Sequence, residues 1–360
     1  MKNLSLIIIS ILFCTHCSYA GIVDAKHNRL DDKTAQYRIE NLEPQVVLPY
    51  TNETKRLLDI YTYSYLPGAR KIVARSNNYF ARYDYILSKK GLPVVLKNIA
   101  VVESNMDPWT FSSRGAVGVW QLMKSTAKAH GLIIDRYVDE RFDPMRASEV
   151  AFDYLKQLYR EFGDWNLALI AYNFGPSALR KTMRYCGSQE YNEIKEALPK
   201  ESKKYASRLA AAAYLSKYFS EHNNRPSGFD VDAKLASIPV YTYITFDEIA
   251  TITGLKRQEI IEYNPAITYD YLPTNSKGYT INLPLKQLAL LITTREWDMN
   301  HIAHLDYHRE DLERLLPFYS SPINSKHDST DKSEEENQKS SISSYLALRR
   351  EQILKMLSLG

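Results

Sequence analysis

Helical spacing of apolar residues dominates the chain from residue 51 to residue 222. In residues 147–162 the apolar side chains recur every three or four positions, and Gly163 follows as a helix-ending residue. Similar patterns cover residues 165–174 and the alanine-rich residues 203–218. The sequence therefore predicts an all-α domain over residues 51–222.

The pattern changes at a turn-rich stretch, residues 223–236, which we interpret as a linker. Beyond it, residues 240–245 alternate between apolar and polar positions, as a β-strand does. Two short helices and a second strand are predicted next, over residues 246–253, 256–263 and 279–283. The result is a small βααβ module over residues 237–286.

Composition suggests how the remaining segments behave. Residues 21–50 are polar and without strong periodicity, which fits an extended or loosely packed lead-in, and residues 287–319 are predicted to be a helical extension. Residues 320–344 are almost wholly polar, so they bury too little apolar surface to become ordered. A short helix is predicted at the end, over residues 345–360.

Residues 1–20 have the layout of a secretory signal peptide. Lys2 provides the positive end, residues 4–13 the apolar core, and Ala20 the small residue before a cleavage site. The apolar run is about ten residues long, whereas a membrane span needs roughly twenty. We therefore expect an exported chain that begins near Gly21 and works in the periplasm or the cell envelope, either free or in peripheral association with the envelope.

Cysteine content and charge narrow the class of protein. Cys14 and Cys17 lie within the predicted signal, and neither follows the small residue that a lipid-attachment site prefers, which leaves Cys186 alone. A lone cysteine excludes an intramolecular disulfide and a cysteine-held zinc site in the mature chain. The formal net charge of +4 is too small to indicate nucleic-acid binding, and the 27 tyrosines suit surfaces that stack on sugar rings.

One carboxylate stands on an apolar stripe. If residues 96–103 are helical, Glu103 shares one face with Leu96, Ile99 and Ala100. A carboxyl group held there loses hydration, which raises its pKa toward the range that a general acid needs near neutral pH. The spacing alone favours a structural carboxylate at the edge of the core, so the choice depends on the segments that follow.

Those segments form an ordered series after Glu103 and Ser104. They are residues 115–123 (GAVGVWQLM), 125–126 (ST), 131–132 (GL), 171–175 (AYNFG) and 198–205 (LPKESKKY). In order and approximate spacing, the series resembles the lysozyme-like lytic transglycosylases, which are the SLT-domain or glycoside hydrolase family 23 type. The resemblance implies a mainly α, lysozyme-like fold and makes Glu103 the candidate catalytic acid.

The resemblance also implies a reaction on peptidoglycan. Glu103 would protonate the oxygen between N-acetylmuramic acid and N-acetylglucosamine, and the 2-acetamido group would stabilise the positive charge. Glu103 would then take the proton of the muramoyl 6-hydroxyl, which closes onto C1 to give a 1,6-anhydro sugar without any cofactor. Most glycosidases use a second carboxylate, and none stands out here: we interpret Asp107 as structural and Asp139, Glu140 and Asp143 as turn or capping residues.

Other residues near the acid have substrate-binding or positioning roles by resemblance. Gln121 supplies an amide for acetamido or hydroxyl groups, and Tyr205 matches a tyrosine that acts near the acid. The full set is Ser104, Gln121, Met123, Tyr172, Asn173 and Tyr205. Residue type alone would allow each of them a purely local hydrogen-bonding role. Gly115 and Gly118 permit either close backbone approach or an ordinary turn.

Three segments of the βααβ module carry a second resemblance. Residues 249–255 (IATITGL), 259–265 (EIIEYNP) and 279–284 (YTINLP) fit the helices and last strand of LysM modules, which bind polymers containing N-acetylglucosamine. The start differs, because residues 243–248 (YITFDE) lack the Gly-Asp pair of the typical opening loop. We expect the module to fold, and its glycan binding is left open.

His301, His304 and His308 have helical spacing, and we expect a surface or interface helix there in preference to a metal site. The whole sequence predicts a peptidoglycan lytic transglycosylase that acts on glycan strands and binds no nucleic acid. Two alternatives are left open. One is a goose-type lysozyme that uses the same acid with water as the nucleophile, and the other is a cell-wall binding protein whose catalytic fold is inactive.

Overall fold

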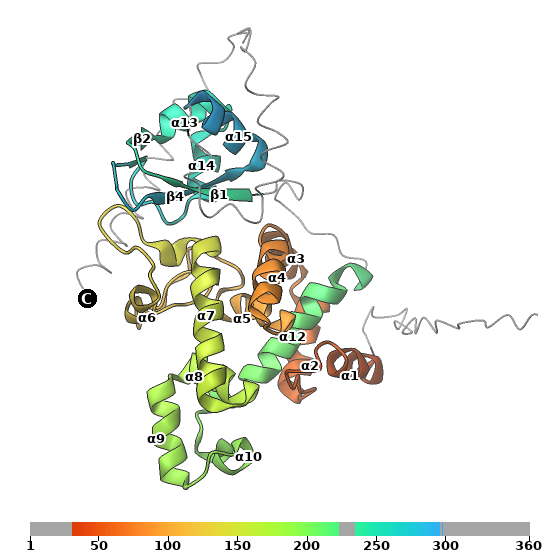
Figure 1. Ribbon diagram of the computed structural model, residues 1–360. Coiled ribbons are helices and arrows are strands. Elements are labelled where there is room, and N and C mark those ends of the chain that lie inside the picture. The colour runs from red at the N-terminus through yellow and green to blue at the C-terminus, as the bar shows by residue number, and fades with distance from the viewer. Residues whose placement is uncertain (1–30, 223–234, 296, 298–360) are drawn as a thin grey trace, which may run out of the picture.

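The computed structural model describes residues 31–222, 235–295 and 297, which form a helical domain and a smaller module beside it (Figure 1). The predicted signal peptide, polar segment 320–344 and C-terminal helix lie outside these residues, as do His301, His304 and His308. Every helix within the described ranges is too short or too polar to span a bilayer.

The helical domain confirms the prediction of a mainly α fold. Its α-helices are α1 (Asp32–Glu40), α2 (Asn52–Asp59), α3 (Leu66–Asn77), α4 (Phe80–Lys90), α5 (Ile99–Ser104), α6 (Lys124–Ala129), α7 (Pro144–Phe162), α8 (Trp165–Phe174), α9 (Pro176–Cys186), α10 (Tyr191–Ile194), α11 (Lys200–Lys203) and α12 (Tyr205–Tyr218). Short helical turns join them: η1 (Ile60–Ser64), η2 (Val94–Asn98), η3 (Glu140–Phe142), η4 (Lys195–Ala197) and η5 (Phe219–His222).

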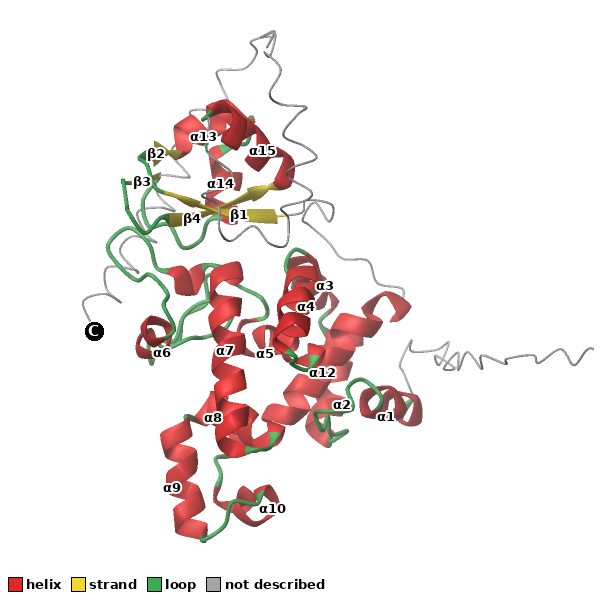
Figure 2. Ribbon diagram, viewed as in Figure 1, coloured by secondary structure: helices red, strands yellow, loops and turns green. Residues whose placement is uncertain are grey.

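Local capping explains where the longest helix ends and the next begins. Asp143 caps α7 by accepting hydrogen bonds from the backbone N–H groups of Met145 and Arg146, and Gly163 ends it with a φ of 70°. Asp164 then caps α8 through the backbone N–H of Leu167. The sharp turn between the two helices lets them pack against each other below the centre of the domain (Figure 2).

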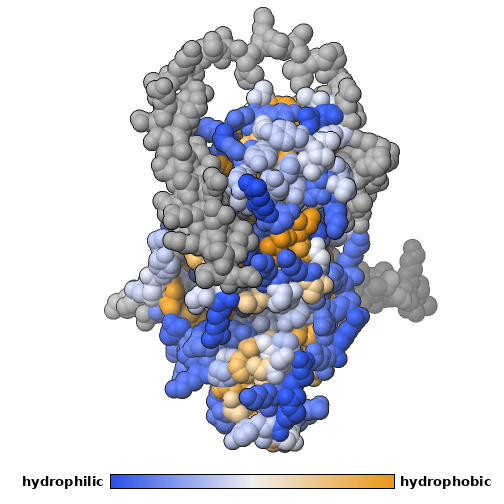
Figure 3. Space-filling model, turned by 90° about the vertical axis from the view of Figure 1, so that its left-hand side faces the viewer, coloured by the Kyte–Doolittle hydropathy of each residue, from blue (hydrophilic) through white to orange (hydrophobic). Residues whose placement is uncertain are grey.

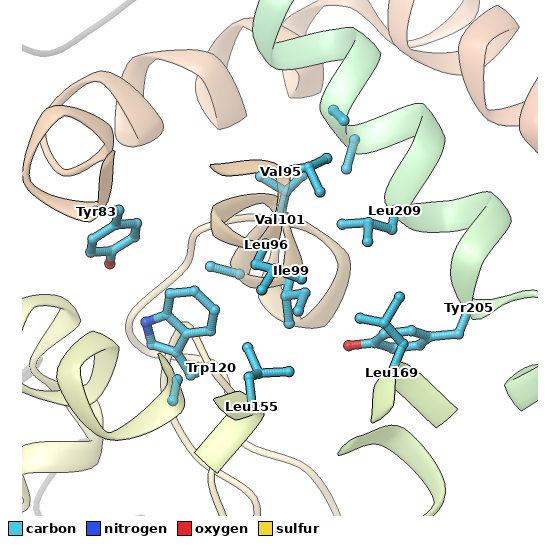
Figure 4. Packing of buried hydrophobic residues seen from close by; sticks show 14 of the residues in the cluster. Tyr83, Val95, Leu96, Ile99, Val101, Trp120, Leu155, Leu169, Tyr205 and Leu209 are labelled. Carbon is cyan, nitrogen blue, oxygen red and sulfur yellow. The ribbon is translucent and has the colours of Figure 1, made fainter. Parts of the chain in front are cut away.

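The short helix α5 passes through the core of the domain. Leu96, Ile99 and Ala100 are fully buried, which confirms the apolar stripe predicted from their spacing. In Figure 4 the side chains of Leu96 and Ile99 lie between Trp120 on one side and Leu209 of α12 on the other. The helix is shorter than predicted, because Val94–Asn98 forms a 3-10 turn after Pro93 and the α-helical hydrogen bonds begin only at Ile99.

The prediction of an extended or loosely packed lead-in over residues 21–50 is wrong for α1. Asp31 caps this helix, Ile39 is fully buried, and Arg38 donates a hydrogen bond to the hydroxyl of Tyr214 on α12 at 3.1 Å. The apolar residues of α1 are few, so its pattern in the sequence is weak. Packing against α12 supplies the stabilisation that the local sequence lacks.

The smaller module contains β1 (Leu235–Val240), β2 (Ile244–Thr245), α13 (Phe246–Thr253), α14 (Arg257–Tyr263), β3 (Tyr271–Leu272), β4 (Tyr279–Pro284) and α15 (Leu285–Thr294). Strands β1 and β4 pair antiparallel, with Leu235 opposite Pro284 and Val240 opposite Tyr279. A second, two-residue ladder joins β2 to β3. Figure 2 shows β1 and β4 on the side of the module that faces the helical domain.

Two predicted boundaries of this module are corrected. The first strand is β1, which begins within the predicted linker 223–236 and ends where the predicted strand 240–245 began. Pro239 lies within β1, where a two-stranded ladder tolerates a residue without an N–H. At the other end, α15 lies in the predicted extension 287–319 but packs on the module, with Leu288, Leu291 and Ile292 buried.

On the face shown in Figure 3, hydrophobic residues form small separate patches among hydrophilic ones. Most large apolar side chains of the two domains are turned inward, into one cluster centred on the helical domain and a second centred on the module. The second cluster also includes Val117, Val138 and Phe142 of the helical domain. The core of the module therefore extends into the helical domain at this boundary.

Candidate active site

Glu103 lies at the end of α5, where the chain leaves the core. Asn105 and Met106 end the helix with φ values of 54° and 58°, which leaves the Glu103 side chain half-buried at the edge of the domain. The hydroxyl of Tyr205 donates a hydrogen bond to Glu103 Oε1 at 2.6 Å. Tyr205 is the first residue of α12 and is almost fully buried, so the packing of the core fixes the position of its hydroxyl.

Burial raises the pKa of Glu103 from the usual 4.5 to about 7. The hydrogen bond from Tyr205 and the positive charge of Arg208 act in the opposite direction and lower this pKa. Neither of these two residues carries a carboxyl group. A carboxyl group with a pKa near neutrality can both donate and accept a proton at physiological pH.

Two hydrogen bonds attach the glycine-rich segment, residues 115–123, to the helices around the acid. The hydroxyl of Ser104 lies 3.0 Å from the carbonyl oxygen of Val119 and 2.9 Å from that of Ala100. From the other side, the hydroxyl of Tyr172 on α8 donates to the carbonyl oxygen of Trp120 at 2.7 Å. Ser104 and Tyr172 therefore hold the backbone of this segment beside α5.

Gln121 has an unusual backbone conformation within the same segment. Its φ of 48° lies in the left-handed region, which costs free energy for a residue other than glycine. Its side-chain amide donates to the carbonyl oxygens of Thr110 at 3.1 Å and Gly118 at 2.8 Å. These bonds use the amide N–H groups locally and stabilise the turn. The side-chain oxygen accepts no hydrogen bond from the described residues, so it is the part suited to a ligand.

Met123 and Asn173 are predicted site residues that make no hydrogen bond to Glu103 within the described part of the chain. Met123 precedes α6 and is 43% exposed. The exposed Asn173 accepts a hydrogen bond from Ser202 on α11 at 3.0 Å. The hydrogen bonds of the described residues link neither side chain to Glu103. The structure thus brings Tyr205 into contact with Glu103, and it links Ser104 and Tyr172 to the glycine-rich segment.

The acids that we interpret as structural have partners of their own. Asp107 pairs with Arg75 at 2.9 Å and accepts a hydrogen bond from the backbone N–H of Trp109. Asp139 and Arg141 form a buried ion pair at 2.7 Å. Within the described part of the chain, no group of three or more His, Cys, Asp or Glu side chains could hold a metal ion.

Sequence reasoning missed three residues that shape the site. Arg208 acts on the pKa of Glu103 through its charge, and the buried ring of Trp120 packs against Tyr83 and Phe152 with centroid distances of 5.4 and 5.0 Å. Arg141 donates hydrogen bonds to the glycine-rich segment. Trp120 could have been found from the sequence, because a tryptophan within a glycine-rich segment is conspicuous. Arg208 and Arg141 could not, because only folding brings them close to Glu103 and to the glycine-rich segment.

Comparison with known proteins identifies both domains. Residues 85–195 match the Transglycosylase SLT domain, so the helical domain that carries Glu103 is a transglycosylase domain of the SLT type. Residues 234–294 match the LysM-like domain of lytic transglycosylase MltD. The two resemblances seen in the sequence, and the lysozyme-like fold that they imply, are confirmed.

Individual relatives show the same relationship. The chain is similar to membrane-bound lytic murein transglycosylase D of Escherichia coli (strain K12), with 25% identity over 198 residues that cover 54% of this chain and 44% of that protein. It is 33% identical over 98 residues to the transglycosylase of Enterobacteria phage PRD1, covering 26% of this chain and 35% of the phage protein. The chain therefore spans less than half the length of either relative.

Among solved structures, the chain is similar to the 70 kDa soluble lytic transglycosylase SLT70 from Escherichia coli. The two share 25% sequence identity with a TM-score of 0.33, over 41% of this chain and 25% of the other.

Proposed function

We propose that this chain is a peptidoglycan lytic transglycosylase that cleaves the β-1,4 bond between N-acetylmuramic acid and N-acetylglucosamine with formation of 1,6-anhydro-N-acetylmuramic acid. The observation that carries the proposal is a single half-buried carboxyl group, Glu103, with a pKa of about 7 and a hydrogen bond from Tyr205, within a domain of the SLT type. The similar proteins of Escherichia coli and of the phage PRD1 are named transglycosylases, which supports the proposal.

In the proposed mechanism Glu103 acts twice. Its protonated carboxyl group gives a proton to the glycosidic oxygen as the bond to C1 breaks, and the 2-acetamido group of the sugar stabilises the positive charge. The resulting carboxylate then removes the proton of the muramoyl 6-hydroxyl, whose oxygen forms the new bond to C1. One acid is sufficient for this sequence because the nucleophile belongs to the substrate, where its effective concentration is high.

The surrounding residues have supporting roles in this proposal. Tyr205 orients the carboxyl group of Glu103, and Ser104 and Tyr172 hold the backbone of the glycine-rich segment against α5. Gln121, Met123 and Asn173 are proposed to contact the glycan strand from around the acid.

We further propose that the protein works in the cell envelope, where its substrate lies. The similarity to an Escherichia coli protein described as membrane-bound supports an envelope location. The predicted signal peptide is consistent with export, followed by periplasmic or peripheral association.

Mass spectrometry of digested peptidoglycan tests the proposed function directly. We expect wild-type protein to release muropeptides that end in 1,6-anhydro-N-acetylmuramic acid. Products with ordinary reducing ends would instead identify a goose-type lysozyme that uses water. If wild-type protein and Glu103→Gln both released no products, a cell-wall binding protein would be the better interpretation.

Replacing Tyr205 with phenylalanine should change the pH dependence of cleavage. The hydrogen bond from Tyr205 lowers the pKa of Glu103, so its removal raises that pKa and shifts the alkaline limb of the rate profile to higher pH. We also expect a rate loss of about tenfold, the equivalent of one hydrogen bond to a charged group. Initial rates of fragment release between pH 5 and pH 9 measure both effects.

Tyr214→Phe is the matched control for this experiment. Tyr214 is also buried on α12, but its hydroxyl contacts Arg38 and His222 and not the acid. We expect the alkaline limb of the rate profile of this variant to lie at the same pH as in the wild type. An unchanged limb in Tyr205→Phe would show that this hydrogen bond does not set the pKa of the catalytic group.

A further inference from the structure

The LysM-like module contacts one particular part of the helical domain, residues 133–143, which we call the bridging segment. Backbone residues 137–139 of this segment pair antiparallel with residues 266–268 of the module. The backbone N–H of Asp139 donates to the carbonyl oxygen of Ala266 at 3.0 Å, and that of Thr268 donates to the carbonyl oxygen of Tyr137 at 2.8 Å. Val138 and Ile267 lie opposite each other in this pairing and are both buried.

Side chains from β4 add polar contacts to the same segment. Asn282 donates from Nδ2 to Asp143 Oδ2 at 2.8 Å, and both residues are almost fully buried, with exposed fractions of 2% and 1%. The hydroxyl of Tyr279 donates to Asp135 Oδ2 at 2.8 Å. Breaking a hydrogen bond between buried polar groups costs more than breaking one at the surface, because water does not replace the lost partner.

The bridging segment in turn holds the glycine-rich segment of the active site. Arg141 is buried and paired with Asp139, and its Nη1 donates to the carbonyl oxygens of Gly115 at 2.9 Å and Leu122 at 3.4 Å. The backbones of the two segments also touch. A Cβ atom placed on Gly118 would lie 1.8 Å from the carbonyl oxygen of Arg141.

We propose that the LysM-like module positions the glycine-rich segment of the active site through the bridging segment, and that Asn282 is a positioning residue for the transglycosylase reaction. The connection runs from Asn282 to Asp143, along the bridging segment to Arg141, and on to Gly115 and Leu122. The first and last steps are hydrogen bonds, and the middle step is the backbone of residues 141–143. Asn282, Asp143, Arg141 and Leu122 are all buried. The proposal rests on the proposed function for its activity readout, and it assigns the module a role that is separate from glycan binding.

The pair Asp143 and Asn282 permits a test in which the hydrogen bond is removed and then restored. Asn282→Asp places a second carboxyl group against the carboxylate of Asp143 and removes the donor. Combining it with Asp143→Asn returns a donor to the pair, because the amide at position 143 can donate to the carboxylate at position 282. Asparagine caps helices as well as aspartate does, so α7 keeps its cap in the double variant. The Ser237 hydroxyl, which donates to Asn282 Oδ1, keeps an acceptor throughout.

Hydrogen–deuterium exchange and steady-state kinetics on the full chain provide the readouts. In Asn282→Asp we expect faster exchange of the backbone amides of residues 115–122, while the amides of α8 stay protected. We expect kcat for fragment release to fall about 10- to 100-fold, the range typical of misplaced positioning groups. The double variant should return exchange to the wild-type pattern and kcat to within a few-fold of wild type.

Gln258→Glu is the control, because it adds one negative charge to the module on α14, where the Gln258 side chain donates a hydrogen bond to Glu262 at the surface and not to the bridging segment. It should leave exchange and kcat unchanged. Unchanged exchange in residues 115–122 of Asn282→Asp would overturn the proposal, as would a double variant that restores neither readout. An inactive wild-type protein would count against the proposed function alone, because exchange still reports whether the module and the glycine-rich segment are coupled.

Discussion

Replacing Glu103 with glutamine should reduce cleavage of peptidoglycan by about 10²- to 10⁴-fold, the usual contribution of a general acid–base group. Glutamine has nearly the same size and can accept the hydrogen bond that Tyr205 donates at 2.6 Å. It can neither give a proton to the glycosidic oxygen nor take one from the muramoyl 6-hydroxyl. Initial rates of fragment release, measured with purified peptidoglycan, provide the comparison.

Asp107→Asn is the matched control for this loss of activity. Asp107 is the nearest acid along the chain after Glu103, but it pairs with Arg75 and accepts a backbone N–H in a turn. We expect this variant to keep most of the wild-type rate. A loss as large as that of Glu103→Gln would point to two cooperating carboxylates and contradict the single-acid mechanism.

The substitution Glu103→Gln should also change how the stability of the protein depends on pH. Glu103 has a pKa of about 7 in the folded protein against a usual 4.5, so the folded state favours its protonated form. The stability that this preference contributes is complete below pH 4.5 and is lost as the pH rises through 7. Relative to wild type, the unfolding temperature of Glu103→Gln should therefore be higher at pH 8 than at pH 5. An equal difference at both values would show that the carboxyl group is not held in its protonated form.

Replacing Gly118 with alanine should disrupt the active-site segment much more than the same change at Gly115. Both glycines have a positive φ, 79° and 83°, so alanine costs roughly 1–2 kcal/mol of backbone strain at either position. At Gly115 the new Cβ atom would meet nothing within 4 Å, whereas at Gly118 it would lie 1.8 Å from the backbone carbonyl oxygen of Arg141. A backbone atom inside the domain cannot move aside as a flexible side chain would.

We therefore expect Gly118→Ala to lose about 1–3 kcal/mol more stability than Gly115→Ala, the usual cost of overpacking, and to lose most of its activity. Chemical denaturation of the two variants measures the difference. Equal unfolding free energies would show that the segment moves away from Arg141 without cost, which would also weaken the case for a rigid connection to the LysM-like module.

The helices of the catalytic domain were predictable where local signals were strong. Asp164 and Gly163 sit at helix ends and act on backbone groups within three or four residues, so the sequence contains all the information needed to place them. The helix α1 was not predictable in this way, because its few apolar residues become stabilising only against α12. The strand β1 was misplaced because its ends are set by pairing with β4, a strand about forty positions further along the chain.

The sequence by itself determined the class of domain, the identity of the candidate acid and the lysozyme-like fold, because ordered motifs and helical spacing are local properties of the chain. Only the tertiary structure decided the electrostatic state of Glu103, since its pKa depends on burial and on Tyr205, a residue 102 positions away. The same holds for the contact between the LysM-like module and the bridging segment. Hydrogen bonds such as that of Asn282 with Asp143 join residues 139 positions apart, and no local pattern specifies which distant groups folding will bring together.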